Sequence, residues 1–200
     1  MNKVLLIGAI VGLFISTAEI QAAKYAIDAD HTSVKFEVAH LVVSSVEGNF
    51  KTLGGDLNFD PAAIDKSELD AWVDVGSIYT GNEKRDKHLR SDDFFSAIKF
   101  PKITLKSKKI EKKSDKNFIM TGAFAMHGVS KDVPFDCDYK GSVSAWGKDR
   151  VAFKCSAKIN RKDFGMSFGA LADAAAVVGD EVEIKLIVEA MKDSAKAATK

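Results

Sequence analysis

The chain has 200 residues, of which 46% are hydrophobic and 28% are charged, and its formal net charge is +1 at neutral pH. This length and composition fit one globular domain with short appendages. A net charge so close to zero provides neither a basic field for nucleic acid nor an acidic field for a basic partner, so we expect no nucleic-acid binding. Thirteen phenylalanines, against two tryptophans and three tyrosines, favour a large apolar interior.

Residues 1–22 have the pattern of a secretory signal peptide. One lysine precedes an apolar run over residues 4–15, and small residues follow up to Ala22 and Ala23. This is the order of an export signal, and the run is too short for a stable membrane anchor. We expect cleavage after one of these two alanines and a soluble mature protein; a retained anchor is the alternative.

Most of the remaining domain, residues 23–190, alternates apolar and polar residues with period two. Val34, Phe36 and Val38 illustrate the pattern, with polar residues between them. Such alternation predicts strands with one buried and one wet face. We expect about eight strands, because some segments can belong to one long bent strand: 24–28, 32–41, 45–59, 67–79, 101–112, 116–127, 129–141, 150–161 and 180–191. The polar tail over 191–200 is expected to fray.

Little helix is expected between these strands. Residues 82–90 predict a short helix capped by Asn82, residues 91–97 a second turn, and the alanine-rich residues 171–176 a third candidate. Many antiparallel strands with few helices predict an all-β sandwich or closed barrel. Gly54 and Gly55, inside a long strand segment, fit a bulge or sharp bend, with a plain loop as the alternative.

The two cysteines test the pairing of two strands. If a hairpin turns around Trp146, Cys137 lies opposite Cys155 and Tyr139 lies opposite Phe153, all on one face. Export permits a disulfide at this position, but the geometry between directly opposite residues is tight. A bridge and two buried free thiols are therefore both left open, and we expect no catalytic role for either thiol.

Candidates for metal or enzymatic chemistry are limited to scattered histidines. No histidine pair has i, i+4 spacing, and the sequence contains no Cys-x-x-Cys, nucleophile elbow or phosphate loop. We therefore expect no enzyme activity, no metal site and no cofactor. The alternative function is a metal-dependent redox or enzymatic role, with ligands assembled from distant parts of the fold, that uses His31, His40, His88 and His127. A module that binds another protein is a third alternative.

Residues 80–95 interrupt the alternation with dense charge. Glu83 with Lys87, and Asp86 with Arg90, have i, i+4 spacing with the acid first, which is the favourable order for ion pairs. Two phenylalanines follow and lead back to apolar surroundings. We expect this segment to cover one end of the β structure as a mouth or lid, with a plain surface connection as the alternative. The residues expected in the mouth are Arg85, Asp86, His88, Arg90, Phe94 and Phe95.

Six segments, in order, resemble the YceI-like family of secreted polyisoprenoid-binding proteins. The longest match, at 77–95, is the most specific. Two features depart from the family pattern: Tyr25 stands where a tryptophan is common, and the cysteine pair is not a general family feature. The matching segments are IDADHTSVKFEVAH at 27–40, EGNFKTLGGDLNFDP at 47–61, SIYTGNEKRDKHLRSDDFF at 77–95, FPKITLKS at 100–107, MTGAFAMHGVSKDV at 120–133 and INRKDFG at 159–165.

The resemblance implies an all-β, lipocalin-like antiparallel eight-stranded barrel with short helical turns at one end. It further implies a periplasmic binding or carrier protein for a long apolar ligand, such as a polyisoprenoid or an isoprenoid quinone. Transient membrane contact and a homodimer are left open. A barrel of this size can enclose one ligand, although alternation alone does not distinguish a hollow barrel from a filled one. The residues expected to line the cavity are Val34, Phe36, Val38, Leu69, Val73, Val75, Ile103, Leu105, Phe124, Phe153 and Leu186.

Overall fold

The computed structural model describes residues 22–41, 43–168 and 177–193. The expected signal peptide, apart from its last residue, lies outside these ranges, as do the helix candidate at 171–176 and the tail beyond residue 193. None of the helices in the described part of the chain has the length and apolarity needed to span a bilayer.

Strands dominate the described residues, as the alternation predicts. One α-helix, α1 (Glu83–Arg90), and three short 3-10 turns, η1 (Ile64–Lys66), η2 (Val75–Ser77) and η3 (Arg161–Phe164), connect them. The strands are β1 (Ala23–Ile27), β2 (Ser33–His40), β3 (Ser44–Phe50), β4 (Leu53–Phe59), β5 (Glu68–Asp74), β6 (Ile78–Tyr79), β7 (Lys102–Lys112), β8 (Asn117–Met126), β9 (Val129–Ala145), β10 (Lys148–Asn160) and β11 (Val178–Lys192).

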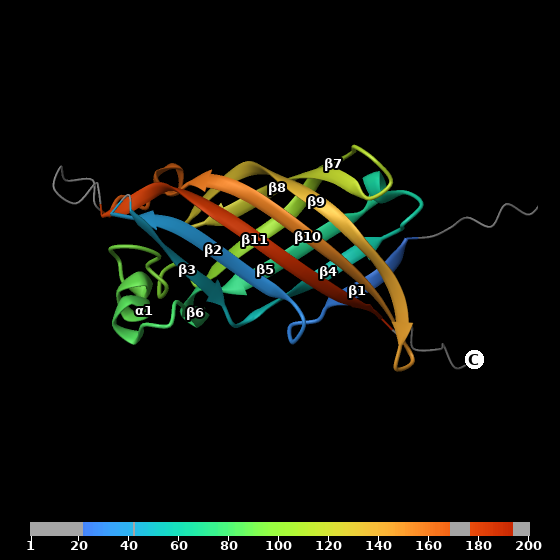
Figure 1. Cartoon of the computed structure of the whole chain (residues 1–200), viewed down its shortest axis with the longest axis horizontal. Helices are drawn as coiled ribbons and strands as arrows, with labels where there is room; N and C mark the ends of the chain where they lie inside the picture. The colour runs from blue at the N-terminus through green and yellow to red at the C-terminus, as the bar shows by residue number, and fades with distance from the viewer. Residues whose placement is uncertain (1–21, 42, 169–176, 194–200) are drawn as a thin grey trace, which may run out of the picture.

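The strands close into a barrel (Figure 1). β1, β4, β5, β7, β8, β9, β10 and β11 are antiparallel neighbours in that order, and β11 pairs back onto β1, so the ring has eight strands. The long strand β11 serves two partners, because one part of it pairs with β1 and another with β2. From β2 the wall continues through β3 and β6 at the end of the barrel that carries α1. The predicted eight-stranded antiparallel barrel is confirmed.

The predicted long segment 45–59 is two strands, β3 and β4, separated at Lys51 and Thr52. The carbonyl of Thr52 accepts a hydrogen bond from the Asp74 amide at 2.9 Å. No bulge interrupts the β4–β5 pairing at the glycine pair, and the glycines do not form a loop, because both pair with β5 in unbroken register. Gly55 instead allows close contact between strands: its φ is +152°, and a Cβ would lie 2.4 Å from the carbonyl oxygen of Asp70.

The predicted β9–β10 pairing is confirmed, with Cys137 opposite Cys155 and Tyr139 opposite Phe153. The two cysteines form a disulfide. The hairpin turn is made by Trp146 and Gly147, whose φ angles are +51° and +73°. Positive φ at two successive positions gives the turn the hand that matches strand twist.

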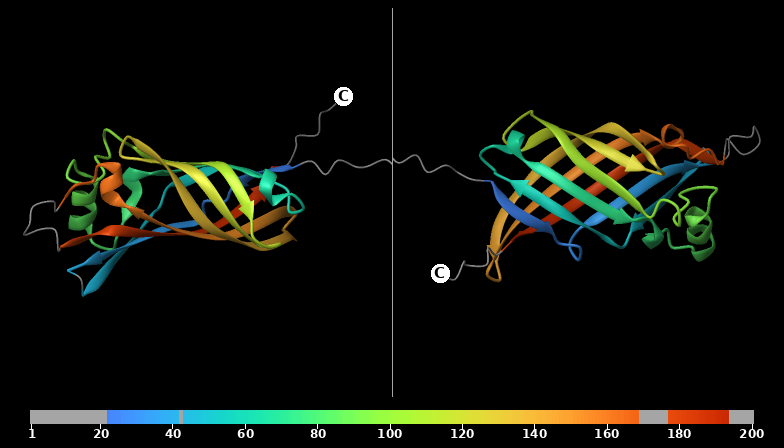
Figure 2. Two further views of the ribbon diagram at one scale, coloured as in Figure 1. Left: turned by 90° about the horizontal axis from the view of Figure 1, so that it is seen from above. Right: turned by 180° about the vertical axis from the view of Figure 1, so that it is seen from behind.

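The end of the barrel opposite α1 is filled by an aromatic cluster, which we call the plug: Tyr25, Phe59, Phe118, Tyr139 and Phe153. Phe59 contacts both Tyr139 and Phe153, with ring centroids 5.0 Å apart in each case. All five side chains are buried. The barrel is elongated, with α1 at one end and the β9–β10 turn at the other (Figures 1 and 2). The plug therefore closes this end of the barrel.

Candidate functional site

An apolar cavity of about 160 Å³ lies inside the barrel toward the α1 end. Inward-facing side chains of β2, β5, β7, β8, β10 and β11 form its walls, and Leu89 of α1 borders it. A cavity of about 150 Å³ lined by aliphatic and aromatic side chains stays dry and holds a benzene-sized molecule. The cavity is thus large enough for a compact apolar group, and a long chain must also displace neighbouring side chains.

A second void of about 60 Å³ lies deeper, next to the plug and the disulfide. Leu69, Leu186 and Val188 border both spaces. Only these side chains are common to the two linings, so they form the partition between them. Rotation of a leucine side chain costs little compared with the apolar contact that an inserted chain provides. The two spaces can therefore act as one channel for a flexible apolar chain.

Most of the predicted cavity residues lie where the alternation places them. Two do not line the main cavity. Val75 is only 1% exposed, but it begins η2, where the period of two ends and its side chain leaves the cavity face. Phe153 belongs to the plug and borders the deeper void. The nine that line the main cavity are Val34, Phe36, Val38, Leu69, Val73, Ile103, Leu105, Phe124 and Leu186.

Several lining residues were not selected from the sequence. Val182 and Ile184 carry the same alternation signal on β11 and could have been selected by it. Leu89, Met166 and Arg161 lie on a helix, a loop and a 3-10 turn, where period two gives no signal. Their positions depend on how the connections fold over the end of the barrel.

The predicted helix at 82–90 is confirmed, with the Asn82 side chain accepting a hydrogen bond from the Arg85 amide at 3.1 Å. The predicted turn over 91–97 is present as hydrogen-bonded turns, with the Phe94 amide donating to the Ser91 carbonyl at 3.1 Å. It is not helical, and Ser91 ends α1 instead of capping a new helix. Phe94 and Phe95, which follow, are buried and border the cavity. The ring of Phe95 lies 6.0 Å from that of Phe50 on β3.

The predicted ion pairs of α1 are wrong: neither Glu83 with Lys87 nor Asp86 with Arg90 forms one. Asp86 is buried, and its carboxylate accepts hydrogen bonds from the amide and hydroxyl of Thr80 at 2.8 and 2.6 Å. The Arg85 guanidinium donates to the same hydroxyl oxygen and to the Thr80 carbonyl, at 2.7 and 2.9 Å. Arg85 and Asp86 therefore fasten α1 to the end of β6.

Arg90 and His88 complete this attachment. Arg90 donates to the Ile78 carbonyl at 3.4 Å. The His88 ring lies edge-on to the rings of Phe94 and Phe168, at 5.0 and 5.2 Å, and its Nε2 is 2.9 Å from an Asp93 oxygen. The expected mouth residues thus divide into two groups. Phe94 and Phe95 face the cavity, whereas the polar ones hold the helix in place.

Arg161 is a buried cation at the cavity, only 3% exposed. Its guanidinium donates to the carbonyls of Gly179 and Met166 at 2.8 Å each, and to that of Val178 at 3.2 Å. The Asp180 carboxylate accepts a further hydrogen bond at 3.1 Å. A buried charge is tolerated when its donors are satisfied in this way. Arg161 therefore joins η3 to the start of β11.

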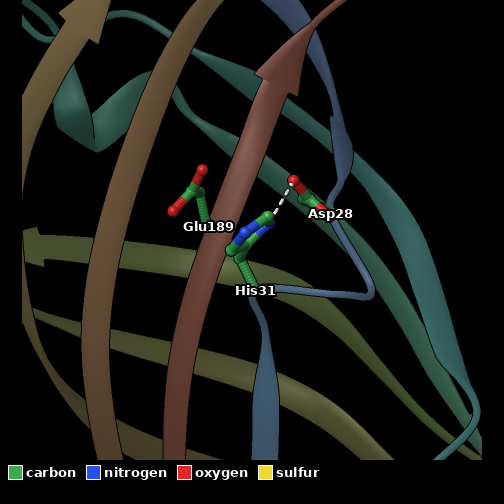
Figure 3. Close-up of side chains that lie close together, drawn as sticks. All are labelled: Asp28, His31 and Glu189. Carbon is green, nitrogen blue, oxygen red and sulfur yellow. Dashed lines mark hydrogen bonds and ion pairs between the residues drawn. The ribbon is translucent and has the colours of Figure 1, made fainter. Parts of the chain in front are cut away.

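The four histidines do not converge on one site. His40 lies at the end of β2 and His88 on α1, while His127 lies in the β8–β9 turn with Nδ1 3.1 Å from the Phe164 carbonyl oxygen. Among the described residues, one set of three potential metal-ligating groups has donor atoms within 4.8 Å of one another: Asp28, His31 and Glu189 (Figure 3).

This set already has internal partners. His31 Nδ1 lies 2.8 Å from an Asp28 oxygen, and Arg150 donates from Nε to the Glu189 carboxylate at 2.7 Å. The same place also has backbone contacts, because the Asp28 amide donates to the Glu189 carbonyl at 2.8 Å. We call this position the seam, since β11 changes partner here from β2 to β1. Its polar groups connect the end of β1 and the start of β2 to β11.

Comparison with known proteins agrees with this architecture. The YceI-like domain model matches residues 25–190. A UPF0312 protein of Vibrio parahaemolyticus is 36% identical over 147 residues, which cover 72% of this chain and 78% of the relative. The crystal structure of a Campylobacter jejuni YceI protein is 35% identical, with a TM-score of 0.68 over 78% of this chain and 90% of that one.

A third protein shares the fold at lower identity. It is described as a polyisoprenoid binding domain from Saccharophagus degradans, with 14% identity and a TM-score of 0.67 over 86% of this chain and 99% of that one. The family model covers most of the chain, and the predicted resemblance is confirmed. The chain belongs to the YceI-like family.

Proposed function

We propose that this protein is a periplasmic carrier that binds one long apolar lipid of the isoprenoid type, a polyisoprenoid or an isoprenoid quinone, inside the barrel. The observation that carries the proposal is the cavity, whose wall is apolar apart from a few groups such as Thr32, Thr104 and Arg161. The polyisoprenoid binding described for the Saccharophagus domain of the same fold supports this ligand class.

Apolar transfer alone is sufficient to drive such binding. Each buried CH₂ group contributes roughly 0.8 kcal/mol, so one isoprene unit contributes on the order of 4 kcal/mol before the cost of ordering the chain. Neither a catalytic group nor a cofactor is needed for this step. Rotation of Leu69 and Leu186 between the two voids would let the chain extend past the first unit, which favours a linear chain over a rigid polycyclic ligand.

Native mass spectrometry of protein purified from its own cells tests the ligand, followed by organic extraction and identification of what is released. We expect an apolar, isoprenoid-containing molecule in a one-to-one complex. Protein that is empty from its native source, and that also fails to take up added polyprenol or quinone, would contradict the proposal. Cell fractionation with N-terminal sequencing tests the periplasmic location, for which we expect a mature chain beginning at Ala23 or Lys24.

A further inference from the structure

The β2–β3 hairpin at the α1 end has an apolar tip. A turn of this kind ordinarily contains Gly, Asn or Asp, but its two described residues here, Leu41 and Val43, are aliphatic. Leu41 has a φ of +52°, which is uncommon for a bulky residue, and it is 49% exposed. Val43 is 88% exposed. The tip therefore presents aliphatic side chains to the outside at a position where polar residues would be easier to accommodate.

A second apolar tip lies in the turn that follows the mouth phenylalanines. Ile98 is 100% exposed. The turn that carries it is tied to α1, because the Ala97 amide donates to the Arg90 carbonyl at 3.0 Å. The β2–β3 hairpin and α1 lie at the same end of the long axis in all three views (Figures 1 and 2). Both tips are therefore at the end toward which the cavity lies.

The surface around these tips also carries unpaired positive charge. Lys84 and Lys87 of α1 and Lys99, next to Ile98, are exposed and form no ion pair within the described residues. Glu83 is an exposed acid on the same helix, whereas the other acids of this segment, Asp86, Asp92 and Asp93, are bonded to Thr80, Ser96 and His88. Exposed aliphatic tips combined with nearby lysines complement a bilayer that has anionic headgroups over an apolar interior. Each lysine near such a surface raises the affinity of the protein for the anionic bilayer about fivefold.

We propose that the α1 end of the barrel docks onto an anionic lipid bilayer. Leu41, Val43 and Ile98 insert between the headgroups, and Lys84, Lys87 and Lys99 contact the phosphates. The ligand then passes between cavity and bilayer at the docked end, without crossing bulk water. This inference rests on the proposed carrier function, because it assigns the surface through which that carrier exchanges its lipid.

The opposite end of the barrel supplies a matched control. Trp146 and Val143 are 90% and 59% exposed, so that end also presents apolar side chains. The plug and the small second void lie behind it. If the protein bound lipid only through exposed apolar groups, it would bind through either end. Docking for ligand exchange uses only the α1 end.

Vesicle flotation tests the proposal with the full chain and three variants. The aliphatic variant combines Val43→Ser and Ile98→Ser, and the lysine variant combines Lys84→Gln, Lys87→Gln and Lys99→Gln. The control variant, at the opposite end, combines Val143→Ser and Trp146→Ser. Intact mass confirms that all preparations have the same N-terminus, because a retained leader would bind vesicles by itself. The vesicles contain phosphatidylethanolamine with phosphatidylglycerol, and phosphatidylcholine vesicles serve as the neutral comparison.

We expect the wild type to float with the anionic vesicles and much less with the neutral ones. The aliphatic variant should bind at least tenfold more weakly, the lysine variant should lose its preference for anionic lipid, and the control should match the wild type. Absence of wild-type binding, or an equal loss in the control, overturns the proposal. The proposal is also overturned if sedimentation analysis shows that the wild type is a dimer and the aliphatic variant is a monomer, because this face would then bind a second copy of the chain.

Ligand binding without vesicles, measured on the same proteins, separates this inference from the carrier function. The aliphatic variant should bind added polyprenol as the wild type does, because Val43 and Ile98 do not line the cavity. Loss of vesicle docking with ligand binding intact supports both proposals. Ligand binding intact with no wild-type docking overturns the docking surface alone, and absence of ligand binding in every protein overturns the carrier function.

Discussion

The imidazole Nδ1 of His31 lies 2.8 Å from a carboxylate oxygen of Asp28. The pair lies at the seam. There the Thr32 hydroxyl donates a hydrogen bond to the Glu189 carbonyl and accepts one from the Glu189 amide, both at 3.1 Å. Burial acts to raise the pKa of Asp28, but hydrogen bonds from His31 and the Asp30 amide outweigh it, so this pKa lies below its ordinary value of 3.8. The hydrogen bond to Asp28 raises the pKa of His31 above its ordinary 6.5.

The first prediction is a pH-dependent contribution of this pair to stability. The raised pKa of His31 contributes stability that is full below pH 6.5 and is lost as the pH rises through the folded-state value. The lowered pKa of Asp28 contributes stability above pH 3.8 that is lost as the pH falls. His31→Gln should therefore lower the free energy of unfolding most between about pH 4 and 6.5.

Urea unfolding at several pH values measures this effect. His40→Gln is the control, because its imidazole has no hydrogen-bond partner among the described residues. A pH-independent difference between wild type and His31→Gln would show that the ion pair contributes nothing.

The second prediction concerns Leu186, which borders both voids. Leu186→Ala should join them into one longer channel and raise the affinity for long prenyl chains relative to short ones. It should also lower the free energy of unfolding by about 2–5 kcal/mol, as buried leucine truncations do. Binding of a polyprenol length series measures the shift. Leu57→Ala removes the same atoms from the deeper void alone, so it should destabilise the protein without changing the length preference.

A third prediction places the ligand inside the barrel. Phe36 lines the cavity and contacts Phe50, with ring centroids 5.9 Å apart. Phe36→Asp should abolish binding of an apolar ligand, because an ionised carboxylate in an apolar wall is strongly unfavourable. Ala39→Asp places the same charge on the same strand at an exposed position and should leave binding unchanged. Circular dichroism establishes that both variants fold, and binding retained in folded Phe36→Asp would locate the ligand elsewhere.

Arg161 gives a fourth prediction. Arg161→Met removes donors to three carbonyl oxygens and to Asp180. Buried acceptors left without partners cost about 1–3 kcal/mol each, so the variant should lose about 3 kcal/mol or more of unfolding free energy. The neighbouring Lys162 also binds Asp180, at 2.7 Å, but it is exposed. Lys162→Met should therefore change stability by less than about 1 kcal/mol; equal effects would show that the carbonyl contacts contribute little.

The disulfide gives a fifth prediction. Cys137 and Cys155 are separated by 18 positions, and closing a loop of this length stabilises a folded chain by about 3 kcal/mol. Replacement of both cysteines by alanine should lower the free energy of unfolding by about that amount. A reducing agent should lower the melting temperature of the wild type and leave that of the double variant unchanged. Identical behaviour of the two proteins would indicate that the thiols are not bridged in solution.

Local patterns predicted much of the barrel. Alternation on β2 and β7 correctly placed Val34 and Ile103 on the inner face, because side chains of a strand point to opposite faces with a period of two. Asn82 was recognisable as a cap because its side chain satisfies an amide of the first helical turn. The same reasoning failed for Asp86, whose carboxylate turns to Thr80 at the end of β6 instead of to Arg90 one turn along.

The sequence by itself therefore determined which side of each strand faces inward, where α1 begins, and that Cys137 meets Cys155. These are local relationships, set by backbone period and by pairing across one hairpin. Only the tertiary structure decided how deep each inward side chain lies. Phe153 and Phe124 both face inward, yet one fills the plug and the other borders the cavity. Depth depends on where strands distant in sequence meet when the ring closes, and the same closure brings His31 and Asp28 to Glu189.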